Sequence, residues 1–214
     1  MNAWTDAIVV LVALTNLALL GSSRLSVCIR VVAIQGIFFG LAAVLLRAEP
    51  LTMDLGLVAL ASVVMKGIVF PALLLRTARN VNIRREVEPF VGFTTSLFIG
   101  LGLLGIALWI GSQLPSAANP TGSLVIPLAL FTVMVGLFTI ASRKKAISQV
   151  LGYLTMENGI FAFGVTVVGG IPVLVELGVL MDVFVAVFVM CIATWHISRE
   201  FDHIDVDQLN ALKG

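Results

Sequence analysis

Charged side chains are scarce in this 214-residue chain: only 12% of its residues are Asp, Glu, Lys or Arg, against about 25% in a typical soluble domain. The hydrophobic share is 59% and the mean hydropathy is +1.10. So few polar side chains cannot cover the surface of a soluble domain of this length, which predicts that a lipid bilayer solvates most of the chain. A net charge of +1 gives no basic surface for nucleic acid either.

Patterns that bind metals or form disulfides are also missing from the sequence. The two cysteines, Cys28 and Cys191, lie in apolar runs with no CxxC spacing and no second ligand nearby. Iron–sulfur, zinc and disulfide sites therefore lack the residues that they require. The first apolar run has no basic region ahead of it, which predicts that this run stays as a membrane span and is not cleaved as a signal peptide.

What the chain does have is a series of long apolar runs. A helix needs about 20 residues to cross a hydrocarbon core of about 30 Å. The predicted spans cover residues 3–21, 26–46, 51–75, 90–112, 123–142, 146–168 and 171–197. None of them has the charged face of a surface helix, and glycine is frequent in them, as in closely packed membrane helices. The sequence predicts an all-α polytopic membrane protein with seven transmembrane helices.

Basic residues alternate along this series, and their alternation predicts the orientation. All but two of the 13 Lys and Arg residues fall at odd-numbered connections or on the C-terminal tail: Arg24, Arg30, Arg76, Arg79, Arg84, Arg85, Arg143, Lys144, Lys145, Arg199 and Lys213. Of the other two, Arg47 lies at an even-numbered connection and Lys66 lies inside a span. Cytoplasmic loops carry the excess of positive charge. We therefore expect a multi-pass protein of a bacterial or archaeal inner (plasma) membrane, with the N-terminus outside and the C-terminus in the cytoplasm.

A short internal similarity predicts two parallel repeats. The run Ile34-Gln-Gly-Ile-Phe resembles Glu157-Asn-Gly-Ile-Phe. When these runs are aligned, Asp54 and Glu176 become equivalent positions in the next span of each repeat. Two three-span units joined by a connector helix are implied, and both start on the outer side. The predicted division is an N-terminal three-span unit with its cytoplasmic loop (1–89), a connector span (90–122), a second three-span unit (123–197) and a cytoplasmic tail (198–214).

Five ionisable residues fall inside the predicted spans or their outer turns, where a charge costs about 2.5–3.5 kcal/mol at the bilayer centre. Glu157 and Asp182 each lie about eleven residues, at 1.5 Å per residue, from the start of their spans, which places both near the midplane. Lys66 is expected in the cytoplasmic third, whereas Asp54 and Glu176 lie close to the outer boundary. Each deep charge needs a partner, a water path or a change of protonation.

Two roles compete for these residues. Burial disfavours the charged form of an acid or a base, so buried groups can exchange protons near neutral pH and form a proton relay. Alternatively, they form static ion pairs that only fix helix packing. Because Glu157 and Asp182 match in depth and neither span carries a basic residue near them, the relay is favoured for both. Lys66 fits either role. Asp54 and Glu176 are near enough to the interface to be hydrated, although Glu176 is also a candidate relay member.

Other polar features support these sites. Pro71 lies five residues after Lys66, and its ring is expected to displace the carbonyl of Gly67 and to free a polar backbone group there. The amides Asn16, Gln35 and Asn158 are expected to form hydrogen bonds between helices. A supporting role at the relay is left open for Asp54, Gln35, Asn158 and His196. His196 lies near the end of the last span with no cluster of ligands, so a metal role is not expected.

The second three-span unit and the tail resemble the K-type subunit of respiratory complex I and the C subunit of multisubunit cation/proton antiporters. The resemblance rests on Gly152-Tyr-Leu-Thr-Met-Glu157-Asn158, on the acidic last span and on Ile204-Asp205-Val-Asp207. The glycine and asparagine keep the K-type spacing. The acid, Glu157, lies three residues later than in that pattern, which is about one helical turn.

The whole length is similar to the E component of hydrogenase-4 and formate-hydrogenlyase complexes. The run Glu176-Leu-Gly-Val-Leu-Met-Asp182 looks like that component, with Asp182 matching the second membrane carboxylate of the family and Glu176 as an addition. The resemblance implies a non-catalytic membrane subunit of a group 4 nickel–iron hydrogenase assembly. Its carboxylates would carry protons, with energy from electron transfer in other subunits.

The same resemblance implies the partners. They would be antiporter-like membrane subunits and the membrane anchor of the hydrogenase module, with no nucleic acid. No cofactor and no catalytic residue are expected in this chain, and the iron–sulfur clusters and the nickel–iron centre belong to partner subunits. Two alternatives remain: a self-contained secondary transporter with a solute site near Lys66 and Pro71, and a purely structural membrane spacer.

Overall fold

The computed structural model describes residues 3–45, 60, 63–80, 89–114, 124–168, 178, 185 and 188–189, and the regular elements within these ranges are helices. In chain order they are α1 (Ala3–Gly21), α2 (Leu25–Leu45), the π-helix η1 (Met65–Val69), α4 (Phe70–Asn80), α5 (Phe93–Gln113), α6 (Val125–Ser142) and α7 (Ala146–Val168). The all-α prediction is confirmed for this part of the chain.

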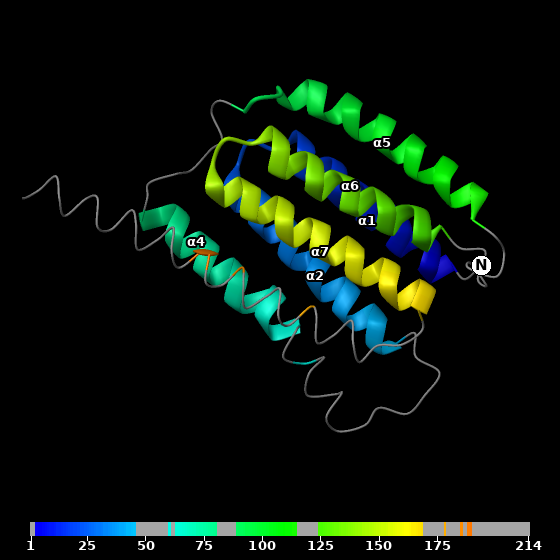
Figure 1. The fold of residues 1–214 in the computed structure, drawn as a ribbon. Coiled ribbons are helices and arrows are strands. Elements are labelled where there is room, and N and C mark those ends of the chain that lie inside the picture. The colour runs from blue at the N-terminus through cyan, green and yellow to red at the C-terminus, as the bar shows by residue number, and fades with distance from the viewer. Residues whose placement is uncertain are drawn as a thin grey trace, which may run out of the picture.

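Two helical hairpins, α1–α2 and α6–α7, form the centre of the bundle (Figure 1). Helix α1 packs on α2 and α6, and α2 packs on α7. Helix α5 lies along one flank, against α6 and α1, whereas η1 and α4 lie on the opposite flank, against α2 (Figure 1). The flanking helices thus leave the two hairpins in the interior.

Glycines let α6 and α7 approach each other at backbone distance. A Cβ atom at Gly136 would lie 2.4 Å from the backbone nitrogen of Met156, and one at Gly159 would lie 2.6 Å from the backbone nitrogen of Val133. Any larger residue at these positions would force the helices apart. Lipid tails are as apolar as leucine, so close van der Waals packing of this kind holds membrane helices together.

A buried arginine ties three helix ends together at one end of the bundle. Arg143, in the turn between α6 and α7, is 3% exposed, and its Nη2 donates to the carbonyl of Leu20 in the last turn of α1 over 2.8 Å. Its guanidinium lies 4.5 Å from the ring centre of Phe93 at the start of α5. The backbone N–H of Phe90 also donates to the carbonyl of Ser142. The cation lies at the negative end of the α1 dipole, where positive charge is stabilised.

These contacts test part of the predicted topology. They bring the connection after α1, the segment before α5 and the α6–α7 turn to one end, and the N-terminus lies at the other (Figure 1). The first, third and fifth connections therefore share a side, as the alternation of basic residues predicts. Both central hairpins also run in the same direction, as parallel units would. The inside–outside assignment and the division into units stay predictions.

Most of the predicted spans agree with helices of the structure, and one differs at its end. Four of them agree with α1, α2, α6 and α7 to within two residues at each end, and α5 begins three residues later than predicted. Span 51–75 was predicted to end at residue 75, but α4, which follows the π-helix η1 in its described part, continues to Asn80. Span 171–197 lies outside the described residues except for Gly178, Val185, Phe188 and Val189, which are helical.

By length and composition, fewer than seven helices qualify as membrane spans in the described residues. In the described residues, α5 and α6 are long and apolar enough to cross a membrane, and shorter apolar stretches cover Val10–Gly21 and Leu25–Phe39. The seven-span topology therefore remains a prediction.

Candidate functional site: a buried ion pair in a polar layer

The central feature of the site is an ion pair between η1 and α7. Lys66 Nζ lies 2.8 Å from Glu157 Oε1, and the two side chains are 10% and 3% exposed. This distance is that of a charge-assisted hydrogen bond. The second oxygen, Oε2, is buried and accepts no hydrogen bond from the described residues. The carboxylate is therefore only half satisfied by the part of the chain that the structure describes.

The backbone beside Lys66 is distorted. Residues Met65–Val69 form a π-helix, and the N–H of Phe70 bonds the carbonyl of Met65, five residues earlier. Pro71 follows directly, and the π-helix includes Gly67, where the sequence predicts a disturbed turn. The freeing of the Gly67 carbonyl stays a prediction. π-Turns are rare and often occur at functional sites. Here the wider turn lies at the residue that carries the buried charge.

Small residues allow Lys66 to enter the bundle. A Cβ at Gly36 of α2 would lie 2.9 Å from the Cβ of Lys66, and one at Gly67 would lie 2.8 Å from Ile37. The same position at Gly36 faces the side-chain oxygen of Asn158 at 3.7 Å. Glycine at 36 therefore makes the room in which η1, α2 and α7 meet.

Two further residues lie close to the charges. The ring centre of Phe161, one turn after Glu157 on α7, is 5.7 Å from Lys66 Nζ, within the range of a cation–π contact. A Cβ at Gly178 would lie 3.8 Å from Glu157 Oε1. Gly178 therefore lies next to the carboxylate, two residues after Glu176 and four before Asp182 in the sequence.

A second polar group lies between α1, α2 and α6. Gln35 Nε2 donates to Thr15 Oγ1 at 2.8 Å and to Asn16 Oδ1 at 3.0 Å, and Asn16 Nδ2 donates to Thr132 Oγ1 at 2.8 Å. Gln35, Asn16 and Thr132 are at most 1% exposed. The prediction that Asn16 and Gln35 form hydrogen bonds between helices is confirmed. Gln35 Oε1 is buried and accepts no bond from the described residues.

These groups lie at similar depth. Gln35 is ten residues from the start of α2, Thr132 ten from the end of α6 and Glu157 eleven from the start of α7, all counted from the end that carries Arg143. At about 1.5 Å per residue this is roughly 15 Å, or half of a bilayer core. The bundle therefore has a polar layer at mid-depth.

The structure corrects one prediction and leaves several outside its range. Lys66 was expected in the cytoplasmic third, but its Cβ lies beside Gly36, eleven residues into α2, and its amine meets Glu157 at the middle of the bundle. The predicted depth was wrong because the helix continues to Asn80 and does not end at residue 75. Neither acidic span carries a basic residue near its acid, so the sequence did not indicate an ion pair for Glu157. Its cation, Lys66, comes from a third helix. Asp54, Glu176, Asp182 and His196 lie outside the described residues.

Arg143 was missed as a buried residue. In the sequence it is the first of three consecutive basic residues and reads as an ordinary loop cation. Its burial, its hydrogen bond to Leu20 and its contact with Phe93 distinguish it from Lys144, which is exposed and lies 5.3 Å from the ring of Phe90. No sequence pattern predicts a contact of this kind between a turn residue and the ends of two other helices.

The fold and the site define a helical membrane protein with an ion pair in its interior, and comparisons with known proteins agree. Residues 124–214 match the family model of NADH-ubiquinone/plastoquinone oxidoreductase chain 4L. Uncharacterized protein Rv0085 of Mycobacterium tuberculosis is 32% identical over 157 residues, which cover 73% of this chain and 71% of that protein.

Hydrogenase-4 component E of Escherichia coli (strain K12) is 35% identical over 102 residues, 48% of this chain and 46% of that protein, and component E of Shigella flexneri matches equally. The matched segment thus spans less than half of component E. No solved structure matches. The chain belongs to the family of these proteins, the K-type, chain 4L-like membrane subunits related to hydrogenase-4 component E.

Proposed function

We propose that this chain is a non-catalytic subunit in the membrane arm of a hydrogenase-4-like assembly related to complex I, and that it relays protons through Glu157 and Asp182. Lys66 sets the charge of Glu157. The protein would lie in the inner membrane with the N-terminus outside and the C-terminus in the cytoplasm. Family membership supports the subunit role, because component E is named as a part of hydrogenase-4.

The Lys66–Glu157 pair is the observation that carries the proposal. A proton that moves from Lys66 Nζ to Glu157 converts two buried charges into two neutral groups, so the pair stores a transferable proton. The half-satisfied carboxylate leaves Oε2 for a water or for a neighbouring acid. A buried ion pair that only fixed helix packing would be more stable if both carboxylate oxygens accepted hydrogen bonds.

Asp182 is the proposed next member. Gly178 lies beside Glu157, and Asp182 follows Gly178 by four residues, the spacing of neighbours on one helix face. A helix through this stretch would turn Asp182 to the same side, one turn closer to the cytoplasm. Glu176 precedes Gly178 by two residues, which places it on another face of such a helix. We therefore rank Asp182 ahead of Glu176.

The electron-transfer chemistry belongs to other subunits in this proposal. The iron–sulfur clusters and the nickel–iron centre would be theirs, and no cofactor would bind here. The partners would be antiporter-like subunits and the membrane anchor of the hydrogenase module. A self-contained transporter would need a solute site near Lys66 and Pro71, but the amine of Lys66 already meets a carboxylate.

The experiment compares one and two neutral substitutions in the assembled complex. Glu157→Gln alone leaves Lys66 buried without its acid, whereas Lys66→Met with Glu157→Gln removes both charges. Complexes are isolated to test assembly, and proton uptake by inverted vesicles is followed with a pH-sensitive dye. Gln113→Leu, at the exposed end of α5 and away from the pair, is the matched control.

A relay and a spacer give different results. If Glu157 carries protons, the double variant assembles but translocates at background level, because no titratable group remains at that position. If the pair only fixes packing, the double variant regains both assembly and full translocation, since removing both buried partners is often neutral. Asp182→Asn is expected to abolish translocation in the same way, and wild-type coupling in the Glu157→Gln/Asp182→Asn variant would overturn the assignment.

A further inference from the structure

The π-turn at Lys66 holds one residue more than a turn of α-helix. The N–H of Phe70 donates to the carbonyl of Met65, whereas in an α-helix it would donate to the carbonyl of Lys66. The backbone is helical on both sides, because Val64 and Phe70 have the φ and ψ angles of a right-handed helix. The extra residue therefore does not end the helix but rotates the residues before it relative to α4. We call this rotation the register of Lys66.

The orientation of α4 itself is fixed by its packing on α2. Its buried side chains form one stripe with helical spacing: Phe70, Leu74, Thr77 and Ala78. Ala72 and Arg76 lie on the exposed side. Because the packed stripe holds α4 in place, the π-turn decides in which direction Lys66 points.

In the observed register, Lys66 faces α2 and α7. A Cβ atom at Gly36 of α2 would lie 2.9 Å from the Cβ of Lys66, and the Lys66 amine lies 2.8 Å from Glu157 Oε1. A straight α-helix would turn Lys66 by about 100°, the angle of one residue, and would move its Cβ by roughly 3–5 Å. That displacement is enough to break a hydrogen bond. Gly67 would then take the place of Lys66 beside Gly36.

Pro71 disfavours the straight α-helix at this point. In that conformation the N–H of residue 71 would bond the carbonyl of Gly67, but proline has no N–H and its ring clashes with the carbonyl four residues earlier. A wider turn moves that carbonyl away from the ring. Glycine at 67 also fits the wide turn against α2, because a Cβ there would lie 2.8 Å from the side chain of Ile37. Pro71 and Gly67 thus both favour the π-turn.

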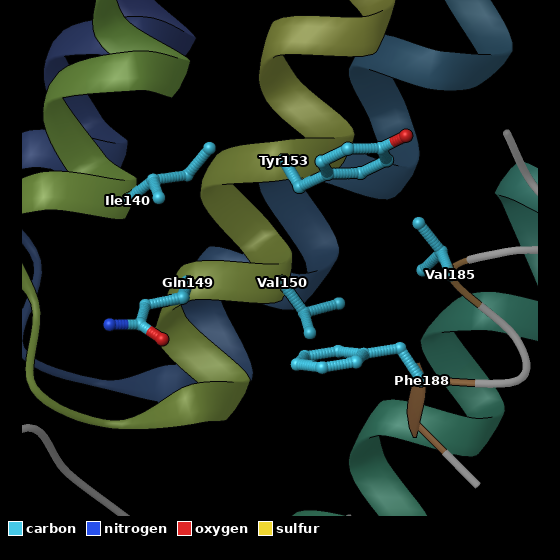
Figure 2. Close-up of a pocket in the computed structure, with 6 residues that line it drawn as sticks. All are labelled: Ile140, Gln149, Val150, Tyr153, Val185 and Phe188. Carbon is cyan, nitrogen blue, oxygen red and sulfur yellow. The ribbon is translucent and has the colours of Figure 1, made fainter. Parts of the chain in front are cut away.

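A displaced amine would find no second acid on α7, since Glu157 is the acid of this helix. One turn before Glu157, α7 borders a cavity of about 210 Å³, where Figure 2 shows the ring of Phe188 extending toward Val150. The described residues that line this cavity include no acid and are Ile140, Gln149, Val150, Tyr153, Val185 and Phe188. An amine turned toward that side would lose its carboxylate without gaining another. The register of Lys66 therefore decides whether the pair forms.

We propose that Pro71 is a positioning residue for the Lys66–Glu157 pair. It stabilises the π-turn, and the π-turn gives Lys66 the register in which its amine reaches Glu157. Loss of the π-turn would leave the carboxylate of Glu157 buried without its cation, and such a group takes up a proton. The effect of this change on proton transport rests on the proposed function. The register and the protonation of Glu157 do not depend on it.

The test moves the lysine by one residue. If Pro71→Ala restores the α-helix, position 67 takes the orientation that position 66 has in the wild type. The exchange Lys66→Gly with Gly67→Lys should therefore break the pair when Pro71 is present and restore it together with Pro71→Ala. Deletion of Ile68, whose side chain is 65% exposed, removes the extra residue and should restore the pair in Pro71→Ala by a second route. Ala72→Leu, at the next position on the exposed face, is the matched control.

The pair is measured by infrared spectroscopy of the assembled complex at neutral pH. A band of a protonated carboxyl belongs to Glu157 if the further substitution Glu157→Gln removes it. We expect no such band in the wild type and in Ala72→Leu, and a clear one in Pro71→Ala. Proton uptake by inverted vesicles should fall at least about tenfold in Pro71→Ala, the effect of losing a hydrogen bond between charged groups, and should recover in the restored variants.

The outcomes separate this inference from the relay. A Glu157 band that appears in Pro71→Ala and disappears in the exchanged or the deletion variant supports the positioning role. Absence of the band in Pro71→Ala, its persistence in both restored variants, or an intact pair in the exchanged variant that keeps Pro71 overturns it. Restored pairing without restored uptake would reject the relay and leave the positioning role standing. If Glu157→Gln stops uptake while Pro71→Ala shows no Glu157 band, only the positioning role fails.

Discussion

Helices α5 and α6 are similarly long and apolar, yet α5 lies at the outside of the bundle and α6 in its interior. In the most apolar stretch of α6, 56% of the residues are buried, against 17% in α5. Both helices contain glycine, but Gly136 of α6 meets the backbone of α7, whereas a Cβ at Gly102 or Gly105 of α5 would meet nothing within 4 Å. Helix α5 exposes Phe98 and Trp109, while α6 buries Phe131.

The difference shows that apolar content does not decide which membrane helix is central. In lipid an exposed leucine costs nothing, so burial follows from close backbone approach and polar contacts. Helix α6 has both, in Gly136 and in Thr132, which accepts a hydrogen bond from Asn16. Three substitutions in the interior test this comparison, each with a counterpart on an outer helix.

The largest effect is expected at the buried charge. Lys66→Met leaves the carboxylate of Glu157 without its cation and should lower the free energy of unfolding by about 3–5 kcal/mol. The measurement is unfolding in mixed micelles, followed by circular dichroism. Arg76→Met, on the exposed face of the flanking α4, should change stability by less than about 0.5 kcal/mol. Equal effects of the two substitutions would contradict the interior placement of the pair.

A smaller effect is expected at the contact between α6 and α7. Gly136→Ala adds a methyl group against the backbone of Met156 and should cost about 1–3 kcal/mol, because neither helix backbone can yield cheaply. Gly105→Ala on α5 meets open space and should raise stability slightly, since alanine is the better helix former. Thermal melting of the two purified variants measures the difference. A loss at Gly105 as large as at Gly136 would show that α5 is packed as tightly as α6.

The smallest effect is expected in the amide network. Asn16→Leu removes the bonds to Gln35 and Thr132 and should cost about 1 kcal/mol, the scale of hydrogen bonds between membrane helices. Ser112→Ala, at the exposed end of α5, removes only a bond to the Trp109 carbonyl of its own helix. It should leave stability unchanged in the same unfolding assay. An Asn16 variant as stable as wild type would mean that water replaces the network.

Sequence reasoning predicted parts of the site because they depend on residue type and depth. Glu157 was placed near mid-membrane by counting residues, and the disturbed turn beside Lys66 was predicted from Pro71. The partner of Glu157 was not predicted, because Lys66 is 91 residues away in sequence and its helix continues to Asn80, past the predicted end at residue 75 that set its expected depth. The hydrogen bond between Asn16 and Thr132 could not be predicted either, because the sequence of two apolar helices does not show how each is rotated about its axis.

Hydropathy and the spacing of basic residues, both readable along the chain, determined the helices, their membrane environment and the connections that share an end. Tertiary structure decided which apolar helices lie inside, that Lys66 meets Glu157, and that Arg143 is buried among three helix ends. The physical reason is that apolar length and loop charge act on each segment separately. Contacts between segments depend on helix rotation and on the distance of closest approach, which glycine permits only where the facing backbone is present.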